Sequence, residues 1–577
     1  MTSTPRSPRS LLAIAVALAV LAPVAAWAAP AAHAATGQVA PLDPSFARYQ
    51  RLLQTHPTTD ARLAPAPLQA APWSDAHLPL GPLAFPVSYD LRTQGKLTAI
   101  RDQGGRNTCW AFATMGSLES TLLPDESFDF SEDDLDLPAE SGFDYGPDGG
   151  GNFYMSTAEL ARWNGPVAEI DDPYDGVFVS GLAPLKHVQN VFFLPDRASA
   201  SDNDTIKAAV TQYGAVFTAM RWENGSYKAS TGAYYYDGSA GGNHAVDIVG
   251  WDDSYSRANF ATQPPGDGAF VARNSWGASW GNAGYFYISY YDIVVGTQMA
   301  VFRGESTSDY AQNLGYDALG FTNNLGYGGD SAWMAAAFTS SGGTSLEAVS
   351  FYAQTPNTAY EIYTAPDLTS ADRSLATSGT VSWPGYTTVP LPASTPMQAG
   401  LPLYVIVKVT TPGWTYPIAV EGAVTGYSSK AASTSGHSFT SAAGLDGSWT
   451  DQGAAGSWYR ADVCLQAFTG TPEPDSIPPY ARALSRASVV KGRYVTLRYR
   501  VDDPSSATEK ANVTIKIRTL GGRLVKTFAL GWKPANTDLG KRFRCSLKRG
   551  AYRFYVYARD LAGNSQSHVG SARLTVK

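Results

Sequence analysis

The spacing of apolar residues predicts helices early in residues 86–303 and strands later. Apolar positions favour helices from Cys109 towards residue 123, over 155–163 and over 204–213. Thr108 is placed to cap the first helix, and Pro124 is placed to end it. Strand-like runs follow at 215–220, 244–251, 268–273 and 284–290. This order predicts an α+β domain with two lobes.

Helical spacing disappears after residue 303. Short strand candidates, separated by Gly, Ser, Thr and Pro clusters, predict a β-sandwich over 304–470. The Pro-rich stretch 471–480 predicts a stiff linker. Strand candidates alternate with turns over 481–577, which has the size and rhythm of an immunoglobulin-like sandwich.

The first 85 residues differ from everything that follows. Residues 1–34 combine two arginines, an apolar run and small-x-small cleavage sites, which predicts a signal peptide and a secreted protein. Residues 35–85 are rich in Pro and Ala, with one short amphipathic helix expected over 45–56. We interpret them as an N-terminal extension or a short pro-segment.

The net charge of −7 conceals an asymmetry. Residues 471–577 contain 21 Lys and Arg against 7 Asp and Glu, whereas the preceding residues contain 22 against 43. A cationic module on an acidic body indicates either contact with a polyanion, such as a wall polymer or membrane surface, or a solvated basic face with no partner. The acidic stretch 125–134 lacks the ligand spacing of a calcium loop, so we interpret it as a solvated acidic surface.

The three cysteines, Cys109, Cys464 and Cys545, are too far apart and too few for a disulfide scaffold. Cys464 lies in an apolar run and is interpreted as a buried small residue, while Cys545 has no obvious mate. Cys109 stands at a predicted helix start, where unpaired N–H groups favour a thiolate. His244 and then Asn274 follow far downstream, which is the chain order of a thiol–imidazole–amide catalytic unit.

Each of these residue types has a chemical role in that unit. A Cys109 thiolate would attack a carbonyl, His244 would protonate the leaving amine, and Asn274 would orient the imidazole. The Cys109 N–H and the Gln103 side-chain amide would stabilise the oxyanion. Trp276 would shield the His–Asn hydrogen bond from water.

The motifs around these residues resemble those of papain-like cysteine peptidases over roughly residues 86–302. They include Gln103-Gly-x4-Cys109-Trp-Ala-Phe, Asp148-Gly-Gly-Gly, Gly242-Asn-His-Ala-Val-Asp-Ile-Val-Gly-Trp and Asn274-Ser-Trp-Gly. The resemblance implies the same roles for Cys109, His244, Asn274 and Gln103. It also implies that Gly150 and Gly151 line a substrate cleft, and that no cofactor or metal is needed.

Two departures from the papain pattern stand out. Papain relatives usually carry a second cysteine three residues before the nucleophile, bridged to another near the cleft glycines. Those places hold Arg106 and Asp148 here, and we hypothesise that an Arg106–Asp148 ion pair replaces the disulfide. The usual long helical proregion is also missing, which argues against inhibition by residues 35–85.

The two C-terminal parts resemble known β-modules. Residues 304–470 are similar to lectin-like modules and imply a possible glycan ligand, and residues 481–577 resemble bacterial immunoglobulin-like modules. We therefore expect a multidomain protein: an α+β two-lobed papain-like catalytic domain at 86–303, followed by two all-β sandwich modules.

The sequence predicts a monomeric cysteine endopeptidase that is secreted and is either free outside the cell or associated with the cell wall. It would act on proteins or peptides, its β-modules would attach it to a surface or substrate, and it would bind no nucleic acid. A polyanion would bind the basic residues 481–577. Two alternatives stay open: an adhesin or carbohydrate-binding protein with a papain-like scaffold, and a transpeptidase or deamidase that uses the same triad.

Overall fold

The computed structural model describes residues 36–55, 63–69, 71, 84–146, 148–369, 372–444, 448–471, 477–503, 510–560 and 563–577. The predicted signal peptide and half of the predicted linker lie outside these residues. Within them, no helix is both long enough and apolar enough to span a bilayer.

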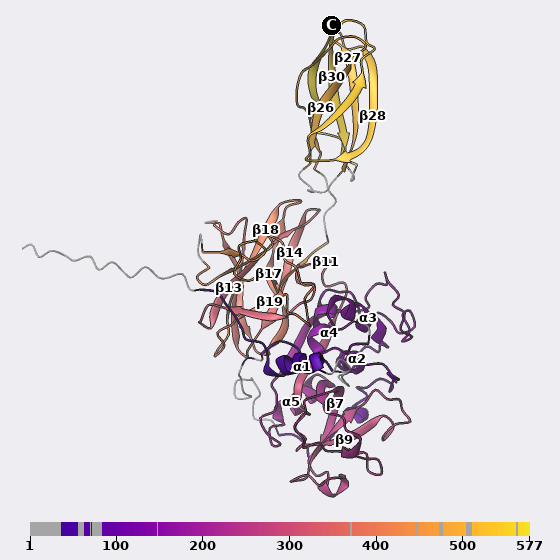
Figure 1. Ribbon diagram of the computed structural model, residues 1–577, viewed down its shortest axis with the longest axis vertical. Helices are drawn as coiled ribbons and strands as arrows, with labels where there is room; N and C mark the ends of the chain where they lie inside the picture. Colours follow the sequence, from indigo (N-terminus) through magenta and orange to yellow (C-terminus); the bar gives the residue numbers. More distant parts are fainter. Residues whose placement is uncertain are drawn as a thin grey trace, which may run out of the picture. The chain divides into compact units, whose positions relative to one another are not determined.

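Residues 86–303 have the two lobes that the sequence predicts (Figure 1). Its helices are α2 (Cys109–Leu122), α3 (Glu132–Gly142), α4 (Phe153–Ala161) and α5 (Asp204–Gln212). Three of them fall where apolar spacing predicts helices, and α3 does not. Helix α2 is buried on all sides from Cys109 to Ser120, as expected of a helix that is apolar all round.

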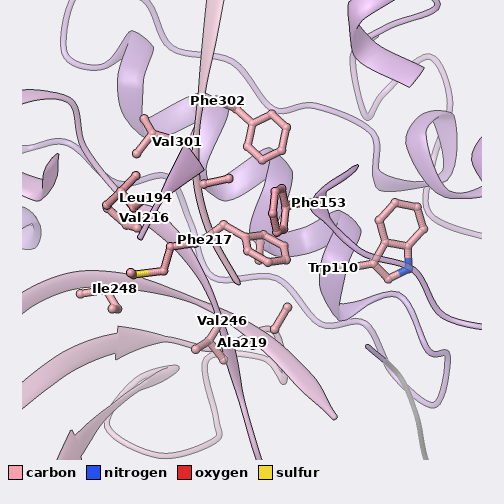
Figure 2. Packing of buried hydrophobic residues seen from close by; sticks show 14 of the residues in the cluster. Trp110, Phe153, Leu194, Val216, Phe217, Ala219, Val246, Ile248, Val301 and Phe302 are labelled. Atoms are coloured by element: carbon pink, nitrogen blue, oxygen red, sulfur yellow. The ribbon is translucent and has the colours of Figure 1, made fainter. Parts of the chain in front are cut away.

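Antiparallel strands form the other lobe and meet α2. The central ones lie in the order β3 (His187–Leu194), β10 (Thr297–Glu305), β4 (Val216–Met220), β7 (His244–Asp252), β8 (Ala269–Arg273) and β9 (Tyr285–Ser289). The shorter β2 (Ser88–Asp90), β5 (Tyr227–Lys228) and β6 (Ala233–Tyr234) extend this sheet. Helix α2 packs against β4, β7 and β10, and Figure 2 shows Trp110, Phe153, Phe217, Val246 and Phe302 around their common core.

The same sheet continues into the lectin-like part. β17 (Gly385–Met397) pairs with β3 through Gly385 opposite Phe192, and the sheet then runs on through β14 (Thr344–Ala353), β23 (Leu465–Thr469) and β11 (Gln312–Leu314). A Cβ on Gly385 would lie 2.0 Å from the Val191 carbonyl oxygen, so only glycine permits this junction. The predicted boundary at residues 303 and 304 falls inside β10, and the strand continues through it.

Two further sheets complete the lectin-like part. One is six-stranded: β16 (Ser374–Val381), β15 (Thr358–Ala365), β18 (Pro402–Thr410), β13 (Ser331–Thr339), β20 (Ser438–Ser441) and β21 (Thr450–Asp451). The other is β1 (Gln38–Val39), β12 (Asn323–Gly326), β19 (Ile418–Gly422) and β22 (Ala461–Val463). The N-terminal extension therefore supplies an edge strand, β1, to the lectin-like part.

Residues 480–576 form a two-sheet module. Its three-stranded sheet is β24 (Tyr480–Ala483), β26 (Tyr494–Asp502) and β29 (Leu539–Arg544). Its five-stranded sheet is β25 (Ala487–Val489), β31 (Gly570–Val576), β30 (Gly550–Arg559), β27 (Lys510–Thr519) and β28 (Leu524–Pro534). Alternate residues of β26 and β27 are buried in one shared core, as strand geometry requires. The predicted fold class, a papain-like domain followed by all-β modules, is confirmed.

The predicted N-terminal helix is present as α1 (Pro44–Thr55). Its Phe46 is fully buried and packs edge-on against Tyr427 of the lectin-like part, at 6.0 Å between ring centroids. The Gln50 side chain also donates a hydrogen bond to the Thr425 carbonyl. The helix is thereby fixed to the lectin-like part rather than left as a loose extension.

Candidate active site

Cys109 is the first residue of α2 and is fully buried. Its sulfur accepts a hydrogen bond of 3.3 Å from the backbone N–H of Ala245. Thr108 holds the N-cap position as predicted, but its side chain does not cap the helix. Its hydroxyl instead pairs with that of Tyr174 at 2.6 Å. The first turn of α2 therefore has no side-chain cap, and the N–H groups of Ala111 and Phe112 donate to the Thr108 carbonyl.

His244 is the first residue of β7, and the next residue of this strand, Ala245, contacts the sulfur of Cys109 at the start of α2. Its Nε2 lies 2.8 Å from Oδ1 of Asn274, which directly follows β8. Because an amide oxygen only accepts, Nε2 carries the proton in this pair. The structure thus brings the predicted imidazole and amide into contact, and Ala245 links the same strand to the Cys109 sulfur.

The indole of Trp276 stacks on the His244 ring, with 4.8 Å between centroids and 21° between planes. Trp222 and Trp280 pack edge-on against Trp276 at 4.7 Å and 5.0 Å. The three tryptophans form an aromatic cluster over one face of the His244 ring. Trp276, the predicted shield, lies directly against that face.

Gln103 is fully buried and is tied to the segment that carries Asn274. Its Oε1 accepts a 2.7 Å hydrogen bond from the Ser275 hydroxyl, and its backbone N–H donates to the Ser275 carbonyl. Its Nε2 donates to the Arg106 carbonyl at 2.8 Å. Sequence reasoning missed both Ser275 and the Ala245 N–H, although Ser275 is part of the Asn-Ser-Trp motif that drew attention to Asn274.

The two glycines predicted to line a cleft lie beside Trp110. Gly150 has φ of +81°, and a Cβ on Gly151 would lie 2.4 Å from the Trp110 ring. Both positions therefore require glycine. The carbonyl of Gly151 accepts a 2.8 Å hydrogen bond from the backbone N–H of Ala64, and Leu63 forms a parallel bridge with Gly151.

The N-terminal extension is thus hydrogen-bonded to the cleft glycines. Asn152 donates to the Ala64 carbonyl at 3.1 Å, and the Tyr145 hydroxyl donates to the Pro65 carbonyl at 3.0 Å. The Leu63 side chain is buried and reaches Gly242, two residues before His244. The short segment 63–65 therefore lies at the cleft glycines.

Two hollows include Asn243, the residue before His244. One, of about 720 Å³, is lined by Trp222, Asn243, His244, Trp276 and the charged Arg221 and Glu223. The other, of about 360 Å³, lies between α1 and Gly241–Gly242 and is bordered by Leu63 and Pro65. The N-terminal extension therefore lines the second hollow and does not line the one that His244 borders.

The hypothesised Arg106–Asp148 ion pair is wrong. Arg106 pairs with Asp133 and, at 2.8 Å, with Asp136, both buried on α3, and it lies over the Tyr174 ring. Asp148 instead accepts a hydrogen bond from the backbone N–H of Asn107. Arg106 and Asp148, which stand where papain relatives have cysteines, both still hold the loop before Cys109. Arg106 does so through the α3 aspartates, and Asp148 does so through the backbone of Asn107.

The interpretation of residues 125–134 as a solvated acidic surface is also wrong at its C-terminal end. Glu132, Asp133 and Asp134 are buried at the start of α3. Burial raises the pKa of Glu132 to about 8, against the opposing effect of Arg101, and raises that of Asp134 to about 7. Arg101 pairs with Glu132 at 3.0 Å, and Arg106 pairs with Asp133. Among the described residues, no group of three or more His, Cys, Asp or Glu side chains is arranged to hold a metal.

The second histidine of this part, His187, lies on β3 and stacks on Trp163 at 3.7 Å between centroids. Burial lowers its pKa to about 4, so it stays neutral near pH 7. It takes part in packing and not in the cluster around Cys109.

Comparison with known proteins agrees with this geometry. Residues 85–302 match the model of the papain family cysteine proteases, and residues 314–469 match that of the lectin-like domain. The chain carries a papain-family cysteine protease domain followed by a lectin-like domain. The resemblance that the motifs indicate is confirmed for both domains.

The first curated relatives each cover about a third of this chain. The viral cathepsin of Spodoptera litura multicapsid nucleopolyhedrovirus is 31% identical over 215 residues, which cover 36% of this chain and 58% of the relative. Mouse (Mus musculus) cathepsin K is 29% identical over 209 residues, which cover 35% and 58%. The chain spans 58–62% of the length of the first curated relatives it matches.

Among the solved structures that resemble this chain is one with both domains. It contains the cysteine protease and lectin-like domains of Cwp84, a surface layer associated protein of Clostridium difficile. It is 24% identical, covers 76% of this chain and 99% of its own, and has a TM-score of 0.64. The likeness shows that the two proteins share a fold.

Proposed function

We propose that this chain is a secreted papain-like cysteine endopeptidase that hydrolyses peptide bonds through Cys109, His244 and Asn274. The observation that carries the proposal is the convergence of these residues: Nε2 of His244 on Asn274 at 2.8 Å, and the N–H of Ala245 on the Cys109 sulfur at 3.3 Å. The match of residues 85–302 to the papain family supports it.

In the first step the Cys109 thiolate attacks the scissile carbonyl carbon and forms a C–S bond. The charge on the carbonyl oxygen is stabilised by the Cys109 backbone N–H and the Gln103 amide. Since Nε2 of His244 is engaged by Asn274, Nδ1 donates the proton to the leaving amine as the C–N bond breaks.

In the second step water attacks the thioester. His244 accepts the proton from that water, the C–S bond breaks, and the new carboxyl terminus leaves. Asn274 and the stacked Trp276 hold the ring in one orientation through both steps. Gly150 and Gly151 offer backbone groups to an extended peptide.

We also propose that residues 63–65 block the cleft until they are displaced. Support comes from the pairing of Ala64 with Gly151, which occupies the backbone group that a substrate would use. The helix α1 and strand β1 hold this segment through the lectin-like part.

The C-terminal modules would attach the enzyme to an extracellular or cell-wall surface. The lectin-like match supports a glycan ligand for residues 304–470, and the excess of cations supports a polyanionic surface for residues 481–577. The Cwp84 structure comes from a surface layer associated protein, which agrees with such a location.

One comparison tests the enzymatic proposal. The full chain, Cys109→Ala and the matched control Cys464→Ala are incubated with an unstructured protein, and the products are identified by mass spectrometry. We expect new carboxyl termini from the full chain and the control, and none from Cys109→Ala. Equal inertness of all three with glycan binding retained would favour the adhesin, and products joined to an added amine would favour a transpeptidase.

A further inference from the structure

The five-stranded sheet of the C-terminal module carries a row of three arginines. β27, β30 and β31 are neighbours, and their registers place Arg518 opposite Arg553 and Arg553 opposite Arg573. Directly opposed residues of antiparallel strands share a face, with Cβ atoms roughly 5 Å apart. Arg553 and Arg573 are exposed and Arg518 is half-buried, so the row faces solvent.

No carboxylate of the described residues forms an ion pair with this row. Arg553 donates to the Ser571 hydroxyl at 3.1 Å, and Arg518 donates to the Gly522 carbonyl at 2.9 Å. These oxygens are uncharged, so they satisfy hydrogen bonds without neutralising the positive charge. Neighbouring positions of the same face add Lys516 and Arg559.

The three-stranded sheet of the same module is arranged differently. Arg482 and Arg500 share Asp502, and Arg500 also reaches Asp538 at 3.4 Å. Like charges placed directly opposite each other destabilise a sheet. The directly opposed arginines of the three-stranded sheet, Arg482 and Arg500, thus have carboxylates beside them, whereas the opposed arginines of the row have none among the described residues. An external anion would take the carboxylate's place at the row.

Two tyrosines on the same face indicate which class of anionic ligand would fit the row. Arg553, Tyr555 and Tyr557 occupy every second position of β30, so their side chains lie on the same face of the sheet. Lys516 lies 4.8 Å from the Tyr557 ring centroid. Guanidinium groups bind planar anions through paired hydrogen bonds, and aromatic rings accept the apolar faces of sugars.

We propose that the row of Arg518, Arg553 and Arg573 binds an acidic polysaccharide, with its anionic groups at the arginines and its sugar rings against Tyr555 and Tyr557. This inference rests on the surface-attachment role proposed above. It specifies which surface of the C-terminal module would bind and which class of ligand it would bind.

Binding of the full chain to polygalacturonate tests the proposal, with neutral dextran and a single-stranded thymine oligonucleotide as comparison probes. The row variant is R518S/R553S/R573S. Its matched control is R482S/R498S/R542S, which removes three cations from the three-stranded sheet. We expect salt-sensitive binding to polygalacturonate and none to dextran, weakened about tenfold or more in the row variant and by less than about threefold in the control.

R518K/R553K/R573K adds a readout that depends on the fork geometry, and thermal unfolding checks that each variant is folded. The lysine variant should bind more weakly than wild type, because it keeps the charge but loses the paired hydrogen bonds. Equal weakening in the row and control variants would overturn the proposal, since charge without position would then suffice.

Three further outcomes of the binding experiment would also overturn the proposal. Tighter binding to the oligonucleotide would identify a nucleic acid as the partner, and salt-sensitive self-association lost in the row variant would identify a second copy; either overturns the proposal. Absence of all polymer binding would reject both the row and the attachment role, while peptide cleavage, measured separately, would still decide the enzymatic proposal.

Discussion

Three buried cysteines occupy very different surroundings. Cys464 lies beside Asp317, and burial together with that carboxylate raises the pKa of its thiol well above the ordinary value. Cys545 is buried in the apolar core of the C-terminal module. Only Cys109 stands at a helix start, next to a strand that begins with a histidine. Burial alone therefore does not make a nucleophile; the charges and dipoles around the sulfur decide its reactivity.

The carboxylates near Cys464 make stability depend on pH. Burial raises the pKa of Asp317 to about 7, whereas an unfolded aspartate titrates near roughly 4. The folded state thus binds a proton more tightly, and its stability is complete below about pH 4 and falls as pH rises towards 7. Glu421 and Asp462, with pKa values raised to about 8 and about 6, act in the same direction.

We expect Asp317→Asn to remove part of the loss of stability that occurs as pH rises towards 7. The amide mimics the neutral carboxyl, so the variant should exceed wild type by roughly 1–3 kcal/mol in free energy of unfolding at pH 7.5 and match it near pH 4. Denaturant unfolding at both pH values measures the effect. The exposed Asp330→Asn is the control, and parallel pH profiles for wild type and Asp317→Asn would contradict the account.

At the scale of elements, an ionic network connects α3 to the loop that leads to Cys109. Arg106 joins two α3 aspartates and lies over Tyr174, whose hydroxyl donates to the Gln103 carbonyl at 3.0 Å and pairs with Thr108. Asp133 also accepts the backbone N–H groups of residues 175 and 176. The network therefore fixes both ends of the segment from Gln103 to Cys109.

We expect Arg106→Met to lower the free energy of unfolding by roughly 2–4 kcal/mol and to reduce kcat, because it leaves Asp133 and Asp136 buried without a cation. The triple variant R106M/D133N/D136N should recover most of the stability. Arg92→Met, which breaks an ion pair between more exposed side chains, should cost at most about 1 kcal/mol. Unfolding and turnover are measured together. A stable, fully active Arg106→Met would contradict a positioning role.

The segment over the cleft makes a separate prediction. Leu63→Asp places a charge where the structure buries an apolar side chain, so the segment should be released and cleavage of a small peptide should rise roughly tenfold or more. Leu52→Asp alters an exposed leucine of α1 and should behave like wild type. The initial rates of peptide cleavage by the three chains, measured without preincubation, test this prediction. Equal rates for all three chains would show that residues 63–65 do not block the cleft.

How far the sequence predicts this structure depends on where each signal resides. The helix at Cys109 and the order of Cys109, His244 and Asn274 are local or motif-borne, so they could be predicted. Helix α3 could not, because its buried carboxylates resemble a solvated surface until Arg101 and Arg106 are known to meet them. The contacts of Ala245 and Ser275 also depend on tertiary pairing that no spacing rule encodes.

On the scale of the whole molecule, the protease and lectin-like domains share a sheet and a core. β17 pairs with β3, and Phe193 lies 6.2 Å from Tyr352 of β14 between ring centroids. The apolar cluster around Trp110 extends to Phe321, Tyr386 and Tyr427. The C-terminal module has a separate core of its own.

Truncation should reveal this difference. A chain ending at Gly470 should keep its peptidase activity on a small peptide, because no strand of the shared sheet is removed. A chain ending at Glu305 should fail to fold or lose most of its stability, because β3 keeps β10 but loses β17 on its other edge and the shared core is exposed. Circular dichroism melts and peptide cleavage check both. A stable, active product ending at Glu305 would contradict the shared core.

The most direct test of the account is the rate at which iodoacetamide alkylates each cysteine at pH 6, followed by mass spectrometry in the Leu63→Asp chain. Cys464 and Cys545 serve as internal references. The account predicts rapid labelling of Cys109 alone, and at least tenfold slower labelling of Cys109 when His244→Ala is added. Labelling of Cys109 no faster than an ordinary free thiol, or unaffected by the loss of His244, would contradict it.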